Sequence, residues 1–247
     1  MAGKVYLVGA GPGDPKLITV RGLELLRSAD VVVYDSLAGE ELLKEVRKDA
    51  ELIDVGKRGG CHKVRQEGIN DIIVSKARDG LVVVRLKGGD PFMFGRGGEE
   101  AEELRSNGLE VHVAPGVTSA ISAPALAGIP VTHRDHASFV TFVTGHESET
   151  KDEEIIDWPG LARLGGTIVI LMGMARLGKN MERLMDGGLS KDTPVAVVHK
   201  GSTPEQRVVL GTVGDIEERC KDEGVGSPAV TVVGSVANLR NILGDLR

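Results

Sequence analysis

The chain has 247 residues, enough to bury the core of one large domain or of two modest ones. Hydrophobic residues make up 41% and charged residues 27%, as in ordinary soluble globular proteins, while 34 glycines and only 3% aromatics indicate tight loops around an aliphatic core. The net charge of −6 argues against a generic nucleic-acid or anionic-membrane binder, because such proteins need a basic excess.

The sequence shows no pattern typical of a membrane span, a signal peptide or a disulfide framework, and this indicates the cellular compartment that we expect. No segment approaches the ~18 consecutive apolar residues of a membrane span. A glycine turn at Gly9–Asp14 stands where a signal peptide needs its apolar stretch, so we expect no export. Cys61 and Cys220 are isolated, which favours reduced thiols over a disulfide framework or a zinc site. The sequence therefore predicts a cytoplasmic protein.

The first half of the chain alternates short apolar runs with helical patterns. The expected strands are Val5–Gly9, Val31–Tyr34, Glu51–Val55, Val82–Leu86 and Glu110–Val113. Between them, apolar side chains recur with the period of a helix, as at Ile69, Ile72 and Ile73. Because strands joined by helices need crossover connections, this half predicts a mainly parallel sheet with helices on both faces.

The second half predicts a mixed sheet with helices. Its expected strands are Ser138–Thr144, Thr167–Met172, Pro194–His199, Gln206–Gly211 and Ala229–Val233. Only a short turn separates the third of these from the fourth, which favours an antiparallel hairpin. Pro115-Gly116 breaks the pattern before a new helix, so we predict an α/β protein with domains at residues 1–114 and 115–247.

Glycine-rich polar loops follow several expected strands. The richest runs from Gly88 to Glu100 and combines glycines with Asp90, Arg96 and two glutamates. Companion segments are Gly9–Asp14, Val32–Leu37, Pro115–Ala120 and Ile129–Asp135. Such chemistry at strand ends is typical of an α/β enzyme whose site lies at the carboxyl edge of a sheet.

Two segments match nucleotide-binding motifs only in part. In Gly9–Asp14, Asp14 replaces the third glycine of a dinucleotide fingerprint and would repel a pyrophosphate, so a tight turn capped by Asp14 is the alternative. In Gly173–Asn180, Asn180 stands where a P-loop needs Ser or Thr, which favours a helix start with an exposed Lys179.

Two charged clusters each have a structural and a functional interpretation. Glu100, Glu102 and Glu103 are typical of a solvated helix face, whereas Arg96 and Glu99 stand at a loop–helix junction where a ligand could meet both. The spacing of His133, His136 and His146 fits no common zinc pattern, so anion binding or surface placement is favoured and no metal is expected.

Together these motifs resemble the tetrapyrrole methylases that use S-adenosylmethionine. The resemblance covers essentially the whole chain. It is most specific in RLKGGDPFMFGRGGEE, GIPVTHRD and VTGH, with GPGD, VYDSL, GKRGG, PGVTSA and the GSTPEQ turn in support. It implies a two-domain α/β fold, the cofactor in the cleft between the domains, and a homodimer.

Matching positions carry the family's roles onto this chain. The resemblance implies that Asp35 is the proton acceptor and Lys57 the donor, with Arg96 and Glu99 as further catalytic candidates that compete with Asp35 as base. The implied cofactor contacts are Pro12, Gly88, Gly89, Asp90, Met93, Thr118, Ser119, Met172, Gly201 and Ala229. The implied substrate contacts are Arg58, Lys87, His133, Arg134 and His146.

The implied reaction is methylation of uroporphyrinogen III at C2 and C7, through precorrin-1 to precorrin-2, for cobalamin or sirohaem synthesis. Basic residues near the expected loops, Arg85 among them, suit a substrate with eight carboxylates. Leu171 stands where the family commonly has Tyr, and His136 where an aromatic is common. The alternatives are a methylase of the same fold acting on a later corrin precursor, and a non-catalytic nucleotide-binding module.

Overall fold

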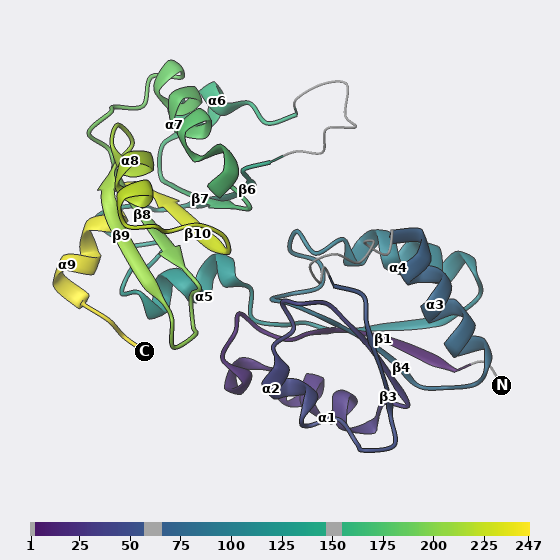
Figure 1. The fold of residues 1–247 in the computed structure, drawn as a ribbon. Coiled ribbons are helices and arrows are strands. Elements are labelled where there is room, and N and C mark those ends of the chain that lie inside the picture. Colours follow the sequence, from purple (N-terminus) through teal and green to yellow (C-terminus); the bar gives the residue numbers. More distant parts are fainter. Residues whose placement is uncertain (1–2, 57–65, 147–154) are drawn as a thin grey trace. The chain divides into compact units, whose positions relative to one another are not determined.

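The computed structural model describes residues 3–56, 66–146 and 155–247 (Figure 1). The chain divides into two compact units, Met1–Thr118 and Ser119–Arg247. The sequence placed a domain boundary after residue 114, and the location of a cofactor relative to the two domains stays a prediction. Each unit is built around its own five-stranded sheet.

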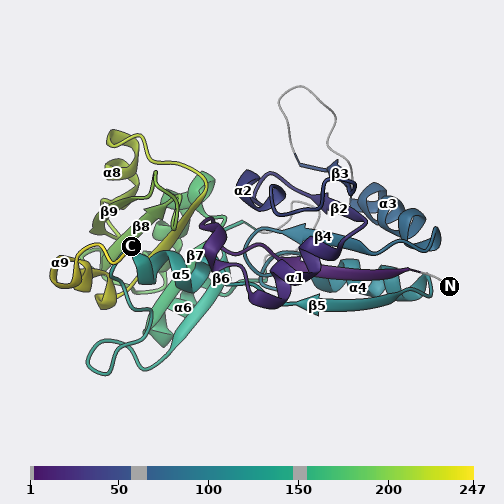
Figure 2. The ribbon, with the colours of Figure 1, turned by 90° about the horizontal axis from the view of Figure 1, so that it is seen from below.

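The first unit contains a wholly parallel sheet, as predicted. Its strands are β1 (Lys4–Gly9), β2 (Val31–Tyr34), β3 (Glu51–Asp54), β4 (Val83–Lys87) and β5 (Glu110–Ala114). Their order is β3-β2-β4-β1-β5, with β3 and β5 at opposite edges (Figure 2). Because all five strands run the same way, the loops that follow them meet at one edge of the sheet.

Helices cover both faces of this sheet, which confirms the α/β prediction (Figure 1). They are η1 (Pro15–Leu17, a 3-10 helix), α1 (Val20–Ser28), α2 (Glu40–Leu43), α3 (Gln66–Arg78) and α4 (Gly97–Ser106). Val83 packs on the face covered by α3 and α4, whereas Val84 and Leu86 pack on the face covered by α1 and α2. Alternation along β4 therefore directs Arg85 and Lys87 toward α3 and α4.

The second unit contains a mixed sheet, also as predicted. Its strands are β6 (Val140–Thr144), β7 (Thr167–Leu171), β8 (Pro194–His199), β9 (Arg207–Thr212) and β10 (Ala229–Val233). Their order is β6-β7-β10-β8-β9, in which only β6 and β7 are parallel. The antiparallel pairing of β8 with β9 confirms the predicted hairpin.

Seven helical segments complete the described part of the second unit. They are α5 (Ser119–Leu126), α6 (Trp158–Leu164), η2 (Met174–Arg176), α7 (Leu177–Asp186), α8 (Ile216–Asp222), η3 (Ser235–Leu239) and α9 (Arg240–Leu243). Apolar side chains of α6, α7 and α8 share a core with one face of the sheet, including Ile168 and Val197. Burial there raises the pKa of the Cys220 thiol to about 11, so this thiol stays protonated near neutral pH. Cys61 lies outside the described residues.

Within the described ranges, no helix combines the length and the apolar character that crossing a membrane requires.

Candidate active site

Backbone segments of three loops touch one another at the carboxyl edge of the parallel sheet. Gly11 and Gly89 exchange hydrogen bonds: the Gly11 amide donates to the Gly89 carbonyl at 3.2 Å, and the Gly89 amide donates to the Gly11 carbonyl at 2.7 Å. A β-carbon on Gly9 would lie 2.5 Å from the Cα of Gly116. Only residues without side chains allow the loops after β1, β4 and β5 to approach this closely.

Asp90 joins two of these loops through its carboxylate. Its Oδ1 accepts the amides of Phe92 at 2.8 Å and Met93 at 3.1 Å, and its Oδ2 accepts the Gly116 amide at 3.0 Å. The carboxylate thus fixes the loop after β4 against the loop after β5. Asp90 therefore shapes the predicted cofactor loop whether or not it touches a ligand itself.

Asp14 caps a short helix, the structural alternative raised by the sequence. Its Oδ1 accepts the amide of Lys16 at 2.9 Å, and Pro15 occupies the first turn of η1. Thr19 caps the next helix by accepting the Gly22 amide at 3.1 Å. The turn that contains Pro12 is therefore closed at its end by a carboxylate that already has a partner.

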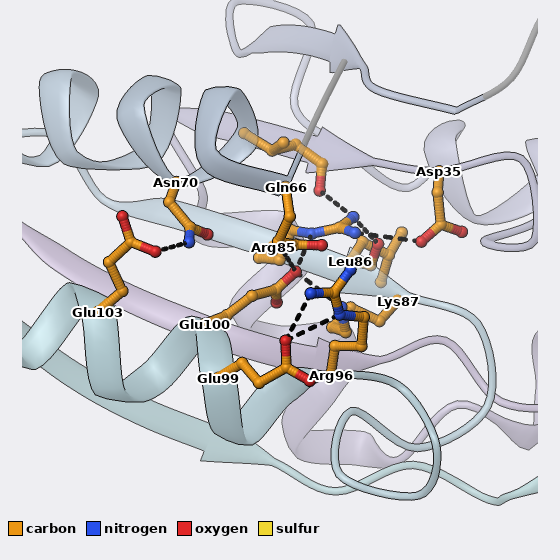
Figure 3. A network of polar contacts seen from close by, with 11 residues as sticks. Asp35, Gln66, Asn70, Arg85, Leu86, Lys87, Arg96, Glu99, Glu100 and Glu103 are labelled. Atoms are coloured by element: carbon orange, nitrogen blue, oxygen red, sulfur yellow. Dashed lines mark hydrogen bonds and ion pairs between the residues drawn. The ribbon is translucent and has the colours of Figure 1, made fainter. Parts of the chain in front are cut away.

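A buried network of charges lies beside these loops on the α3–α4 face (Figure 3). The Arg85 side chain is 4% exposed, that of Lys87 6%, and that of Glu100 0%. Glu100 Oε1 lies 2.9 Å from Lys87 Nζ and 3.4 Å from Arg85 Nε, and Gln66 Nε2 donates to it at 2.9 Å. Two cations and one carboxylate thus share one water-excluded position.

Asp35 lies where this network reaches the carboxyl edge of the sheet. Its Oδ2 is 3.3 Å from Arg85 Nη2, and its Oδ1 accepts the Leu37 amide at 3.1 Å. The Asp35 side chain is 27% exposed, so it is reachable from solvent while Arg85 is not. Asp35 therefore combines an accessible carboxylate, a group able to accept a proton, with a buried cation that orients it.

Electrostatics in the network are dominated by burial. Burial lowers the pKa of Lys87, and the neighbouring Arg85 charge lowers it further, whereas Glu100 acts in the opposite direction. The ammonium of Lys87 thus depends on Glu100 for compensation. The Lys87 ammonium is directed at Glu100, so a role of Lys87 in binding substrate remains a prediction.

Arg96 and Glu99 form an exposed pair at the start of α4. Glu99 Oε2 accepts from Arg96 Nε at 2.9 Å and from Nη2 at 2.6 Å, and the two side chains are 55% and 60% exposed. Arg96 has a left-handed backbone with φ +60°, and its hydrogen bond with Glu99 raises the pKa of the guanidinium. The loop–helix junction therefore presents an oriented guanidinium to solvent.

The second unit gathers four predicted residues at one edge of its own sheet. Strand register places the ends of β6, β7 and β8 beside the start of β10, with Thr144 opposite Leu171 and Ala229 opposite His199. Residues that follow directly, or begin β10, are His146, Met172, Gly201 and Ala229. Met172 has a positive φ of 54° and is 54% exposed, so its side chain is available to a ligand.

Most of the other predicted residues lie in connecting segments. Met93 and Thr118 are half-buried, as is Ser119 at the start of α5, and His133 and Arg134 belong to the segment between α5 and β6. The rings of His133 and His136 meet edge to face with centroids 5.0 Å apart. Asn180, from the incomplete P-loop motif, is buried and donates to the Gly145 carbonyl at 3.1 Å, so it serves the packing of α7. Lys57 and Arg58 lie outside the described residues.

The sequence alone did not indicate a role for Glu100. It was grouped with a solvated acidic face, yet it is fully buried and accepts from three side chains. The signal was helical phase: Gly97 and Leu104 lie on the same buried side of α4. Arg85 and Lys87, placed two residues apart in an apolar strand, were a second sign that a buried counter-charge was needed.

The fold and this site define an α/β protein with glycine-lined loops and an acid–base network at the edge of a parallel sheet. A sequence model described as Tetrapyrrole (Corrin/Porphyrin) Methylases matches residues 4–217. The chain belongs to this family, as the sequence predicted.

Similar proteins extend over nearly the whole chain. A relative from Methanosarcina barkeri (strain Fusaro / DSM 804), named S-adenosyl-L-methionine-dependent uroporphyrinogen III methyltransferase, is 54% identical over 99% of this chain and 96% of its own. The crystal structure of uroporphyrin-III C-methyl transferase from Thermus thermophilus with S-adenyl homocysteine matches with TM-score 0.81 and 38% identity, covering 96% of this chain and 100% of that one. A cobalt precorrin-4 methyltransferase, a cobalamin biosynthetic enzyme, matches with TM-score 0.84 and 34% identity over 95% of each chain.

Proposed function

We propose that this protein is an S-adenosylmethionine-dependent C-methyltransferase that converts uroporphyrinogen III, through precorrin-1, to precorrin-2 by methylating C2 and C7. The observation that carries the proposal is the 54% identity, over 99% of this chain, to a relative named for that donor and that substrate. The geometry supports it, because the loops and charges at the sheet edge provide what methyl transfer to a polyanionic ring requires.

The glycine loops fit a nucleoside donor. The backbone of Gly88 and Gly89 is only half-buried, and no side chain at these positions blocks the approach of a ligand. Pro12 and Met93 flank the same edge, and Met172 and Gly201 supply the predicted contacts of the second unit. When bound, the donor supplies a methyl group on a positively charged sulfur. The chain's task is to hold the acceptor carbon in line with that methyl, and positioning of this kind contributes up to about 7–11 kcal/mol.

Asp35 is the proposed base. Methylation leaves a positive charge on the ring system, and a proton must then depart. Asp35 Oδ2 is held 3.3 Å from Arg85 Nη2 while Oδ1 is fixed by the Leu37 amide, so the carboxylate has a defined direction. Proton acceptance by such a group, directly or through water, contributes roughly 10²–10⁴-fold to the rate. Lys57 is the proposed proton donor.

Exposed basic residues are the proposed contacts of the substrate carboxylates. Arg96 and Arg134 are exposed in a protein whose net charge is −6, so they provide local attraction for a polyanion that the whole chain would repel. Glu99 holds the Arg96 guanidinium by two hydrogen bonds to one carboxylate oxygen. The guanidinium is therefore ordered before the substrate arrives.

Replacement of Arg96 by Lys should weaken substrate binding. A lysine ammonium keeps the charge but loses the paired donors of the guanidinium. Loss of one charge-assisted hydrogen bond, about 1.5–3 kcal/mol, should raise KM for uroporphyrinogen III by about 10- to 150-fold. Steady-state kinetics measure this change. Arg105→Lys, on the same helix but bonded to the Val111 carbonyl, is the matched control, and equal KM values in both variants would remove Arg96 from the site.

A second candidate function is methylation of a later corrin precursor, which the match to cobalt precorrin-4 methyltransferase favours. The test offers uroporphyrinogen III and cobalt precorrin-4 in parallel, each with methyl-labelled donor. Label in uroporphyrinogen III alone supports the main proposal, and label in the corrin precursor alone supports the alternative. A homodimer, a cytoplasmic location and service to cobalamin or sirohaem synthesis are part of the main proposal.

A further inference from the structure

Glu100 is a completely buried carboxylate that none of the predicted roles uses. Its Oε1 lies within hydrogen-bonding distance of donors from three positions: Lys87 and Arg85 on β4 and Gln66 on α3 (Figure 3). Its Oε2 is buried and has no hydrogen-bond partner among the described residues. Oε1 therefore makes all of these contacts.

Burying the Glu100 charge at this position lowers the stability of the folded state. Leu104, one turn further along α4, and Val83, on the same face of β4 as Arg85 and Lys87, belong to a buried aliphatic cluster. Replacing a buried ion cluster by well-packed apolar residues is often neutral or stabilising, so packing alone does not explain why a carboxylate occupies position 100. The contacts of Glu100 lead instead through Arg85 to Asp35.

Arg85 connects Glu100 to the exposed part of the site. Its Nε faces Glu100, its Nη1 donates to the Leu86 carbonyl at 3.1 Å, and its Nη2 faces Asp35 at 3.3 Å. Since a guanidinium is planar, fixing Nε and Nη1 also fixes the direction in which Nη2 points. The orientation of the donor that meets Asp35 is therefore set from the buried side.

We propose that Glu100 is a positioning residue, which compensates Lys87 and orients Arg85 so that the Asp35 carboxylate is held for proton transfer. This inference rests on the proposed function, in which Asp35 is the base. Glu100 touches neither substrate nor donor in this scheme. It acts through Arg85.

The charges around Glu100 determine the direction of the pH effect. The groups that face it are Arg85 and Lys87 from β4, and Gln66, which is neutral, from α3; Asp35 lies beyond Arg85, and Arg96 precedes the same helix. Removing the Glu100 charge leaves a larger net positive charge near the Asp35 carboxylate, and positive charge near a carboxyl group favours its ionised form.

The test replaces Glu100 with Gln in the full chain. Glu100→Gln keeps the shape and removes the charge. We expect kcat for uroporphyrinogen III methylation to fall by about 10- to 100-fold, because a poorly oriented catalytic group loses that much. The acidic limb of the kcat–pH profile should move to lower pH, while the Kd for S-adenosylhomocysteine stays at the wild-type value.

Glu103→Gln is the matched control. Glu103 lies one turn further along α4 and accepts from Asn70 rather than from Arg85 or Lys87. It should show the wild-type kcat and pH profile. If Glu100→Gln also shows them, or if both variants lose activity equally without a shift in the profile, the proposal is overturned.

Two further measurements keep the outcome decisive. If Glu100→Gln does not fold by circular dichroism, Glu100→Asp keeps the charge but draws the carboxylate back from Arg85. A lower kcat with unchanged donor binding then supports the proposal, and wild-type kinetics overturn it. Wild-type protein assayed in parallel distinguishes failure of the proposed function from failure of the Glu100 role. If the wild type does not methylate uroporphyrinogen III, the proposed function fails. An active wild type with an unaffected Glu100 variant refutes only the role of Glu100.

Discussion

Gly116→Ala is expected to disrupt the meeting point of the three loops and to abolish binding of the methyl donor. A β-carbon at this position would overlap the carbonyl oxygen of Gly89 and would lie 2.7 Å from the Cα of Gly9. Both neighbours are backbone atoms, which cannot rotate away, so the loop after β5 must move. That movement also pulls the Gly116 amide from Asp90, whose carboxylate fixes the loop after β4.

The cost should appear in both stability and binding. Overpacking of this kind costs about 1–3 kcal/mol in the free energy of unfolding, measured by urea denaturation. Titration calorimetry with S-adenosylhomocysteine should detect no binding to the folded variant. Gly98→Ala is the control, because a β-carbon at Gly98 in α4 meets no atom within 4 Å and should raise stability by up to about 1 kcal/mol. Normal donor binding by Gly116→Ala would show that the three-loop contact does not form the donor site.

Asp35→Asn is expected to reduce the rate of methyl transfer by about 10²–10⁴-fold. Asparagine has nearly the same shape and can still accept the Leu37 amide, but it cannot take up a proton at neutral pH. Donor binding should therefore be unchanged. Single-turnover assays with preformed donor complex measure the chemical step and separate it from product release.

Asp30→Asn controls for the loss of a carboxylate near the same strand. Asp30 precedes β2, where it pairs with Arg47 and accepts the Val82 amide at 2.7 Å, whereas Asp35 follows β2 at the opposite edge of the sheet. This control should turn over at the wild-type rate even if it is less stable. A full rate for Asp35→Asn with intact donor binding would rule out Asp35 as the base.

The strands were predictable because each buries an apolar run between turn residues. Strands β2 and β8 have the predicted bounds, but β4 extends from Val83 to Lys87 where the sequence indicated Val82–Leu86. The predicted strand ended at Leu86 because the apolar run ends there and a lysine ordinarily lies at the surface. The strand continues because Glu100, 13 residues further along the chain, neutralises Lys87 inside the core.

The short helical segments were less predictable. Neither η1 nor α2 spans enough residues to show a helical period. Asp14 caps η1, whereas α2 begins after Gly39 without a side-chain cap. The incomplete nucleotide motifs were interpreted from chemistry instead, and Asp14 and Asn180 both have structural partners within their own units. Local chemistry thus identified what these motifs are not, although it did not give the exact geometry.

The candidate site was predictable as a set of loops but not as a network. Because parallel strands end at one edge of a sheet, the sequence pattern alone was enough to bring Asp35 and the Gly88–Asp90 loop together. Which glutamate of the acidic run faces inward depends on the helical phase of α4, and four glutamates close together in the sequence obscure the signal that Gly97 and Leu104 give. Glu100 was therefore assigned to the surface, although it is the centre of the buried charges.

The most direct test of the proposed function is to incubate the full chain with uroporphyrinogen III and donor carrying a ¹³C-labelled methyl group, and to examine the product by carbon NMR. The proposed function predicts two labelled methyl groups, both bonded to ring carbons, at C2 and C7. An unlabelled tetrapyrrole from well-folded protein, or label on oxygen or nitrogen, would contradict it.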